Sequence, residues 1–243
     1  MIPLFFGPAE RAKYGVFHPA AGHGTKGRGV VFCDALFDEA IRAHRALRFA
    51  SESMAAARWN SFRFDYFGTG DSAGETQEFN LVQACQDIHE AIQEIRSMAS
   101  LSGVYLLGLR LGGALAMQCA AERDDIRGVI LWDPVVDGSS VLVEFDELAE
   151  PDTSGRHLGG YVFRDELRDQ LQSFTIRDTF SQFNGPILMI CTAATDTHHK
   201  LAQEFPNIDL RIVEAPEAWL RDPAGGVKPI PAAVIRQIEA WQG

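Results

Sequence analysis

Short apolar runs rich in β-branched and aromatic residues alternate along this chain with longer stretches of helical period. The apolar runs fall at residues 4–7, 13–18, 29–33, 60–66, 103–108, 127–133, 186–193 and 208–214. Runs of this kind, separated by helices, are typical of βα units on a parallel sheet. The pattern predicts an α/β fold with about eight strands in a mostly parallel sheet flanked by helices.

The best-defined helix lies between the fourth and fifth apolar runs. Its apolar residues fall at positions i, i+4, i+7, i+11 and i+14 and are Leu81, Cys85, Ile88, Ile92 and Ile95. This spacing puts them on one helix face, which we expect to lie on the sheet, with Asn80 as the N-cap. Weaker stripes predict a helix over residues 37–58 and a final helix opened by Pro231.

One interval between predicted strands is much longer than the others. Residues 139–183, about 45 residues, stand where compact domains commonly use a short connection. The interval contains a stretch of helical period at 163–171. We predict a single domain over residues 1–243 with a helical lid inserted at 139–183.

Composition narrows the classes of partner. Hydrophobic residues make up 46% of the chain and charged residues 23%, as in ordinary globular proteins. The net charge of −11 disfavours binding to nucleic acid or to an anionic membrane, since both need clustered cations. The four cysteines are scattered, which indicates reduced, buried thiols, and no apolar stretch approaches a membrane span. We expect a cytoplasmic protein with a small-molecule partner.

Residues 104–113, Val-Tyr-Leu-Leu-Gly-Leu-Arg-Leu-Gly-Gly, carry the strongest chemical signal. A strand, a tight turn with glycine on both sides of one central residue, and a helix of small residues form the geometry of a nucleophile elbow. Glycines are needed there because strand and helix approach too closely for a Cβ atom. The central residue, whose side chain is thrust into the site, is Arg110.

A second segment carries a resemblance to a known family. Residues 63–74, Arg-Phe-Asp-Tyr-Phe-Gly-Thr-Gly-Asp-Ser-Ala-Gly, resemble the D-x-x-G-x-G-x-S segment after the fourth strand of serine-aminopeptidase-like α/β hydrolases. With the elbow, the resemblance covers nearly the whole chain. It is nearest to bacterial hydrolase-like proteins found with exopolysaccharide, exosortase or secondary-metabolite genes, some of which carry Gly-Leu-Arg-Leu-Gly at the elbow. It implies an α/β-hydrolase fold.

The chain departs from this family at two triad positions. A guanidinium stays protonated and has no lone pair, so Arg110 cannot act as a nucleophile. The family's acid follows the seventh strand, which implies Asp196, or the sixth, which implies Asp133. The family's histidine follows the last strand, but residues 212–223 contain none, and Trp219 lies near its place. Ser-His-Asp chemistry is therefore not expected.

Arg110 has two interpretations. It forms a structural ion pair with Asp133 or Asp196, or it presents its planar fork to a substrate carboxylate, phosphate or developing oxyanion. The resemblance implies that an oxyanion site would use the backbone N–H of Leu111 and one N–H near Asp34–Ala35. A carboxylate at Asp34 would oppose an oxyanion unless Arg110 neutralised it.

Four other residues are candidate substrate contacts: Trp219, Phe67, Tyr161 and His198. His198 and His199 are either a displaced general base or solvated residues that open a short helix, and base rates favour the second. Cys33 and Ser72 are candidate relocated nucleophiles, although a buried cysteine is usually inert and Ser72 belongs to a turn. No residues have metal-ligand or phosphate-loop spacing, so we expect no cofactor and no metal.

These observations leave three hypotheses of function. The first is a lid-covered enzyme without a covalent serine step, in which Arg110 with Asp133 or Asp196 acts on an acyl, ester or other anionic small molecule in a biosynthetic pathway. Hydrolysis, elimination and cyclisation all remain open for it. The second is a pseudo-hydrolase that binds a ligand or a protein and does no chemistry. The third is a hydrolase with a relocated nucleophile.

The first hypothesis ranks slightly above the second, because the chain keeps both acids, the glycine-rich elbow and the long insertion. The second predicts a pocket filled by Trp219, Phe67 and lid side chains, with no room for substrate. A homodimer through the lid or the final helix is compatible with the sequence, and nothing in the sequence requires one.

Overall fold

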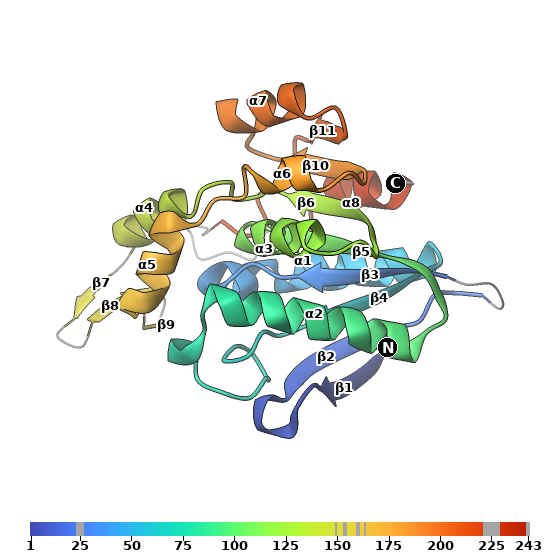
Figure 1. The fold of residues 1–243 in the computed structure, drawn as a ribbon, viewed down its shortest axis with the longest axis horizontal. Coiled ribbons are helices and arrows are strands. Elements are labelled where there is room, and N and C mark those ends of the chain that lie inside the picture. The colour runs from blue at the N-terminus through green and yellow to red at the C-terminus, as the bar shows by residue number, and fades with distance from the viewer. Residues whose placement is uncertain are drawn as a thin grey trace.

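The computed structural model describes residues 1–22, 27–148, 150–152, 155–158, 161–162, 164–220 and 229–241 (Figure 1). Within these residues one sheet has eight strands, in the spatial order β1-β2-β4-β3-β5-β6-β10-β11. The strands are β1 (Ile2–Phe6), β2 (Lys13–His18), β3 (Gly27–Cys33), β4 (Trp59–Phe64), β5 (Leu101–Leu109), β6 (Ile126–Trp132), β10 (Ile187–Cys191) and β11 (Ile208–Ile212). The prediction of an eight-stranded α/β sheet is confirmed.

The pairing of the strands places their carboxyl ends at one edge. β1 pairs antiparallel with β2, and β2 pairs antiparallel with β4. From β4 through β3, β5, β6 and β10 to β11 every pairing is parallel. The chain leaves these strands at the same edge of the sheet, where ligands bind in open α/β sheets.

Helices cover both faces of the sheet. The longer ones are α1 (Phe37–Ala56), α2 (Leu81–Met98), α3 (Leu111–Ala121), α7 (Asp196–Glu204) and α8 (Ala232–Ala240), and the short ones are η1 (Ala9–Arg11), η2 (Thr76–Glu78) and α6 (Thr179–Gln182). Apolar residues of α1 and α8 pack on one face, and those of α2, α3, α6 and α7 pack on the other. Figure 1 shows α2 and α3 in front of the sheet.

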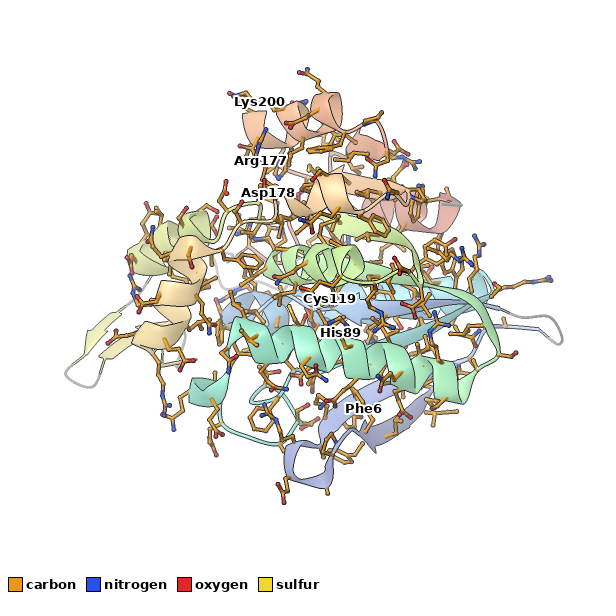
Figure 2. All side chains as sticks on the ribbon, viewed as in Figure 1. Phe6, His89, Cys119, Arg177, Asp178 and Lys200 are labelled. Carbon is orange, nitrogen blue, oxygen red and sulfur yellow. The ribbon has the colours of Figure 1, made fainter. Side chains whose placement is uncertain are left out.

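Two apolar layers result from the alternation of side chains along buried strands. In β5, Val104 and Leu106 belong to the layer under α2 and α3, whereas Leu107 and Leu109 belong to the layer under α1 and α8. Figure 2 shows the first layer filled with side chains, with Phe6 entering it from β1. All four cysteines are buried and free, as the sequence predicts.

Local signals in the helices are also confirmed. The five apolar residues of the α2 stripe are all buried. The Asn80 side chain accepts a hydrogen bond from the backbone N–H of Gln83 at 2.9 Å and so caps α2. Pro231 precedes α8, as expected for the final helix. Among the described residues, no helix is both long and apolar enough to cross a membrane.

The long insertion contains more than helices. It begins with α4 (Gly138–Leu148) and ends with α5 (Asp165–Ser173). Between them lies a small antiparallel sheet of β7 (Glu150–Asp152), β8 (Gly155–Leu158) and β9 (Tyr161–Val162), which the sequence analysis did not predict. Arg168 on α5 donates to Asp146 on α4 at 2.9 Å. Figure 1 shows the insertion at one end of the molecule, and its role as a lid stays a prediction.

Candidate functional site

The elbow has the backbone geometry that the sequence predicts. Arg110 stands alone between β5 and α3, with φ 53° and ψ −123°, a conformation that L residues rarely adopt. A Cβ atom on Gly112 would collide with the carbonyl oxygens of Cys33 and Asp34, and one on Gly108 would collide with the backbone of α3. The turn is held by the Arg110 N–H, which donates to the Trp132 carbonyl at 3.0 Å.

Three residues contact the Arg110 guanidinium. Only 8% of Arg110 is exposed. Its Nε donates to Oε1 of Glu39 on α1 at 2.9 Å, and its Nη2 donates to Oε2 of Glu144 on α4. Its carbon Cζ lies 3.9 Å from the centre of the Trp219 ring, in cation–π contact. The elbow side chain therefore joins α1, the insertion and the segment after β11.

The acid of this constellation is Asp133, directly after β6. Its carboxylate accepts from the backbone N–H and the hydroxyl of Thr192, both at 2.6 Å, and from Nε1 of Trp219 at 3.1 Å. Asp133 is 4% exposed and has φ 42°, so both it and Arg110 are held in strained backbone. Since three donors satisfy Asp133, it needs no ion pair.

Trp219 stands in the connecting position of a triad. In a serine hydrolase an imidazole donates to the acid through one nitrogen and faces the nucleophile with the other. The Trp219 indole also donates to the acid, and its ring covers the elbow side chain. An indole is a donor only, so it cannot accept a proton from position 110. Position 110, the Trp219 ring and Asp133 therefore follow one another as the three positions of a triad do.

Two expectations about ionic partners need correction. The described ion pairs of Arg110 are with Glu39 and Glu144, not with Asp133 or Asp196. Asp196 is exposed at the first turn of α7. Helices α1 and α4 bring their glutamates to the elbow by tertiary packing, which the sequence analysis missed. Burial raises the pKa of Glu39 to about 7, although the Arg110 charge opposes this shift.

The candidate oxyanion donors lie at the same edge of the sheet. The N–H of Leu111 belongs to the first turn of α3, where backbone donors have no intrahelical acceptor. The N–H of Ala35 instead donates to the carboxyl group of Asp34. Burial raises the pKa of Asp34 to about 8, so this group is largely neutral at pH 7. Burial, rather than Arg110, therefore removes the charge that we expected to oppose an oxyanion.

His198 and Phe67, two of the predicted substrate contacts, take part in helix capping and in packing. His198 is 7% exposed. Its Nδ1 accepts from the N–H of Thr195 at 3.1 Å, and its Nε2 lies 3.1 Å from the Pro134 carbonyl, so both ring nitrogens are occupied. Phe67 lies under the guanidinium of Arg11, with Cζ 4.2 Å from the ring centre. The predicted role of these two residues as substrate contacts stays a prediction. The Tyr161 side chain lies outside the described residues.

The candidate relocated nucleophiles are also occupied. Cys33 is fully buried, and burial raises the pKa of its thiol far above the usual range, so it stays protonated. The Ser72 hydroxyl donates to the Asp65 carbonyl at 2.6 Å and accepts from the N–H of Tyr14 at 2.9 Å. It fixes the turn after β4, as the sequence suggested.

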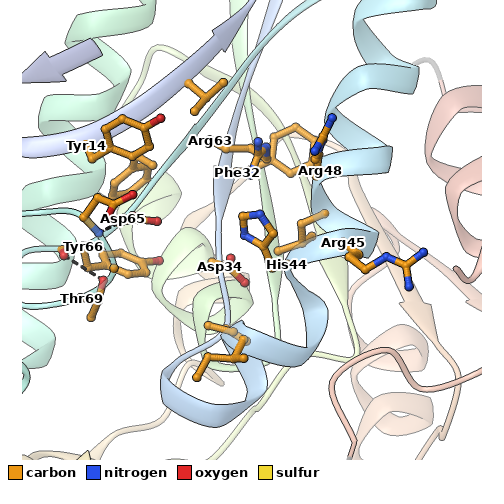
Figure 3. Close-up of a pocket in the computed structure, with 18 of the residues that line it drawn as sticks. Tyr14, Phe32, Asp34, His44, Arg45, Arg48, Arg63, Asp65, Tyr66 and Thr69 are labelled. Carbon is orange, nitrogen blue, oxygen red and sulfur yellow. Dashed lines mark hydrogen bonds between the residues drawn. The ribbon is translucent and has the colours of Figure 1, made fainter. Parts of the chain in front are cut away.

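A cavity of about 750 Å³ lies beside the elbow, on the α1 side of the sheet. Its walls come from β2, β3, β4, α1 and the turn at residues 65–71. Figure 3 shows Asp34 between two groups of side chains, with Tyr14, Asp65, Tyr66 and Thr69 on one side and His44, Arg63 and Arg48 on the other. The residues that line it do not include Arg110, Asp133 or Trp219.

Comparison with known proteins supports the assignment of the fold. The family model described as serine aminopeptidase, S33, matches residues 37–157. No curated protein matches the chain. These results agree with the serine-aminopeptidase-like resemblance that residues 63–74 and the elbow carry.

Solved structures with the same fold include esterases and a thioesterase. Est1E from Butyrivibrio proteoclasticus with ferulic acid has a TM-score of 0.65 at 15% identity, covering 86% of this chain and 88% of that one. DcsB in complex with a substrate analogue has a TM-score of 0.69 at 14% identity, covering 98% and 96%. The thioesterase domain of the curacin biosynthetic pathway has a TM-score of 0.65 at 11% identity, covering 98% of each chain. The fold, the elbow and these similarities show that the chain has the α/β-hydrolase fold.

Proposed function

We propose that this protein is a pseudo-hydrolase: a member of the superfamily that binds a small-molecule ligand and performs no acyl transfer at its elbow. The observation that carries the proposal is the bridge made by Trp219, whose ring covers Arg110 and whose N–H bonds Asp133. Neither Arg110 nor Trp219 can accept a proton, so the elbow lacks both a nucleophile and a base.

The surroundings of Arg110 support a structural role for it. Nε and Nη2 of this guanidinium already bond carboxylates, and the Trp219 ring covers one of its faces, so a substrate anion would compete with these groups. This arrangement favours the pseudo-hydrolase over the hypothesis that Arg110 acts directly on substrate. The insertion is tied to the elbow through Glu144 on α4.

A ligand-binding role draws support from the cavity and from the similar structures. A volume of about 750 Å³ suits a drug-sized organic molecule. Est1E holds ferulic acid and DcsB holds a substrate analogue, so this fold accommodates small organic molecules in those proteins. The curacin domain belongs to a biosynthetic pathway, and we extend that setting to this chain as part of the proposal.

A second candidate function is a non-covalent enzyme that acts on an acyl, ester or other anionic compound. One observation favours it: a carboxyl group with a pKa near 8, such as Asp34, can donate a proton at neutral pH. In that case Asp34, and not Arg110, would be the acid.

Ester turnover tests the two candidates. Purified protein is assayed with p-nitrophenyl acetate, p-nitrophenyl butyrate and an acyl thioester, beside the Arg110→Ala and Asp34→Asn variants. The pseudo-hydrolase hypothesis predicts that all three proteins give the rate of buffer alone. Turnover that Asp34→Asn abolishes would establish the non-covalent enzyme, and turnover that only Arg110→Ala abolishes would make Arg110 catalytic.

A further inference from the structure

Two charged residues of the cavity beside α1 each have a buried polar atom without a hydrogen-bond partner, as does the hydroxyl of Tyr66. The two charged groups are Nε of Arg63, near the end of β4, and Oδ1 of Asp34, directly after β3. Such groups are rare in native proteins, and each one costs free energy when it is left unpaired. Both residues line the same cavity. An arrangement of this kind is expected where a ligand supplies the missing partners.

Arg63 is the main cation of the cavity. Within the described part of the chain it forms no ion pair, whereas Arg48 is paired with Glu52 at 2.9 Å. Burial is the main reason why the pKa values of His18 and His44 are lowered. The positive charge of Arg63 is the second reason for each of them. The positive charge of Arg63 is therefore felt by both imidazoles and is not cancelled by a contact.

The acids around Arg63 do not replace a ligand. Asp34 and Asp65 are the carboxyl groups that act on it most strongly, and burial raises the pKa of both. Asp65 also accepts the backbone N–H of Asp71 at 2.9 Å, which occupies one of its oxygens. A neutral Asp34 leaves room for an anion beside it and can donate to that anion.

Part of the cavity wall is apolar. Phe32, Phe37, Val16 and Ile41 contribute to its walls, together with the ring of Tyr14. Such walls suit a hydrocarbon or aromatic body, while the half-buried Arg63 guanidinium suits one negative charge, which a planar carboxylate matches in a bidentate fashion.

We propose that this cavity binds a small organic carboxylate, with Arg63 holding the carboxylate, Asp34 donating to it, and the apolar walls holding its body. This inference deepens the ligand-binding half of the proposed function and rests on it. The site lies apart from the elbow, so an elbow without hydrolytic activity does not by itself establish the site.

Binding of matched probes tests the proposal. Calorimetry or ligand-observed NMR at pH 7 is performed with benzoate, 4-hydroxybenzoate, 4-hydroxyphenylacetate and octanoate, with the primary amide of each acid, and with phenyl phosphate. At least one carboxylate is expected to bind with Kd below about 1 mM. Its amide is expected to bind at least about tenfold more weakly, since it lacks the charge-assisted bonds.

Two variants locate the site. Arg63→Gln is expected to weaken carboxylate binding by about tenfold or more. Arg45→Gln is the matched control, because Arg45 lines the same cavity but is exposed and extends away from Asp34 in Figure 3. It is expected to change binding by less than about twofold, as a screened surface charge does.

Thermal unfolding guards against a misfolded variant. Arg63→Gln removes a half-buried cation that has no ion pair among the described residues, so its melting temperature is expected to equal or exceed that of the parent protein. A variant that is more stable and yet binds more weakly would confirm that Arg63 serves a ligand.

Three outcomes would overturn the site. They are a panel in which no carboxylate binds, carboxylate binding that Arg63→Gln leaves unchanged, and phenyl phosphate that binds tighter than every carboxylate. Failure here with no ester turnover would reject the cavity alone. Ester turnover that depends on Arg110 would reject the pseudo-hydrolase and leave the carboxylate site standing.

Discussion

Buried charged groups at the elbow have bonding partners, whereas two charged groups in the neighbouring cavity have polar atoms that lack them. At the elbow, Arg110 bonds two carboxylates and stacks on Trp219, and Asp133 accepts three hydrogen bonds. In the cavity, Arg63 and Asp34 each keep a buried polar atom without a partner. Satisfied polar networks stabilise a fold, whereas unsatisfied groups cost stability and commonly mark function.

Under the proposals above, this contrast assigns ligand binding to the cavity and a structural role to the elbow. In a hydrolase the elbow is the reactive point, and here it is the better-satisfied region. Substitutions at the elbow should therefore lower stability, and substitutions in the cavity should preserve or raise it. The predictions below test this difference, beginning with the largest effect.

Removing both carboxylates from Arg110 should cause the largest loss. The double variant Glu39→Gln/Glu144→Gln leaves a guanidinium that is 8% exposed without an ionic partner. We expect the free energy of unfolding to fall by about 3–5 kcal/mol, measured by urea denaturation. As a control, Glu52→Gln breaks the exposed pair with Arg48 and should cost less than about 1 kcal/mol. Equal losses in both variants would contradict a buried anchor.

Substitution of Trp219 should cause the next largest loss. Trp219→Ala removes the ring from Arg110 and the N–H donor from Asp133, for an expected cost of about 2–4 kcal/mol. Trp219→Phe keeps an aromatic face and loses only the donor, so about 1–2 kcal/mol is expected. Urea denaturation of both variants separates the two contributions. A phenylalanine variant as unstable as the alanine variant would show that stacking contributes little.

A substitution in the cavity should raise the stability of the folded protein. The rise should be smaller than the losses expected at the elbow, and it should depend on pH. Burial raises the pKa of Asp34 from 3.8 to about 8 on folding. The charges of Asp65 and Glu39 act in the same direction, and the charge of Arg63 opposes the rise. Between about pH 4 and pH 8 the unfolded chain loses this proton while the folded protein keeps it, so the stability contributed by this group falls as pH rises. The asparagine side chain of Asp34→Asn cannot ionise, so the stability of this variant does not fall with pH through this position.

Thermal melts as a function of pH measure this effect. We expect Asp34→Asn to match the parent protein near pH 4 and to exceed its melting temperature by about 3 °C or more at pH 8.5. Glu39 titrates in the same direction, with a folded pKa of about 7, so the parent protein should keep part of its slope in the variant. A variant that is less stable than the parent at every pH would show that Asp34 has a structural partner.

The sequence predicted the scaffold well, because the relevant signals are local. Alternating apolar runs predict the strands, the i, i+4 stripe predicts α2, and Gly108 and Gly112 predict a turn with no space for Cβ atoms. Asp133 and Trp219 were also found, since each follows a recognisable strand. The small sheet β7–β8–β9 was missed because its strands are only two to four residues long.

The ionic partners could not be predicted from local pattern. Glu39 and Glu144 stand 71 and 34 residues from Arg110 along the chain, and each occupies an ordinary polar position of a helix. Arg63 did carry a usable signal. It shares the α1 side of β4 with Trp59 and Ser61, both buried, so a charged residue there is unusual for an inner strand.

The central claim is that Trp219 occupies the place of a triad histidine and thereby disables the elbow. Its most direct measurement is the intact mass of the parent protein, Arg110→Ser and Arg110→Ser/Trp219→His after treatment with a fluorophosphonate, each first shown to be folded by a cooperative melt. We predict no adduct on the parent protein, none on Arg110→Ser, and one adduct on the introduced serine of the double variant, where a base beside Asp133 is restored. An adduct on the parent protein, or a folded double variant that stays unlabelled, would contradict the account.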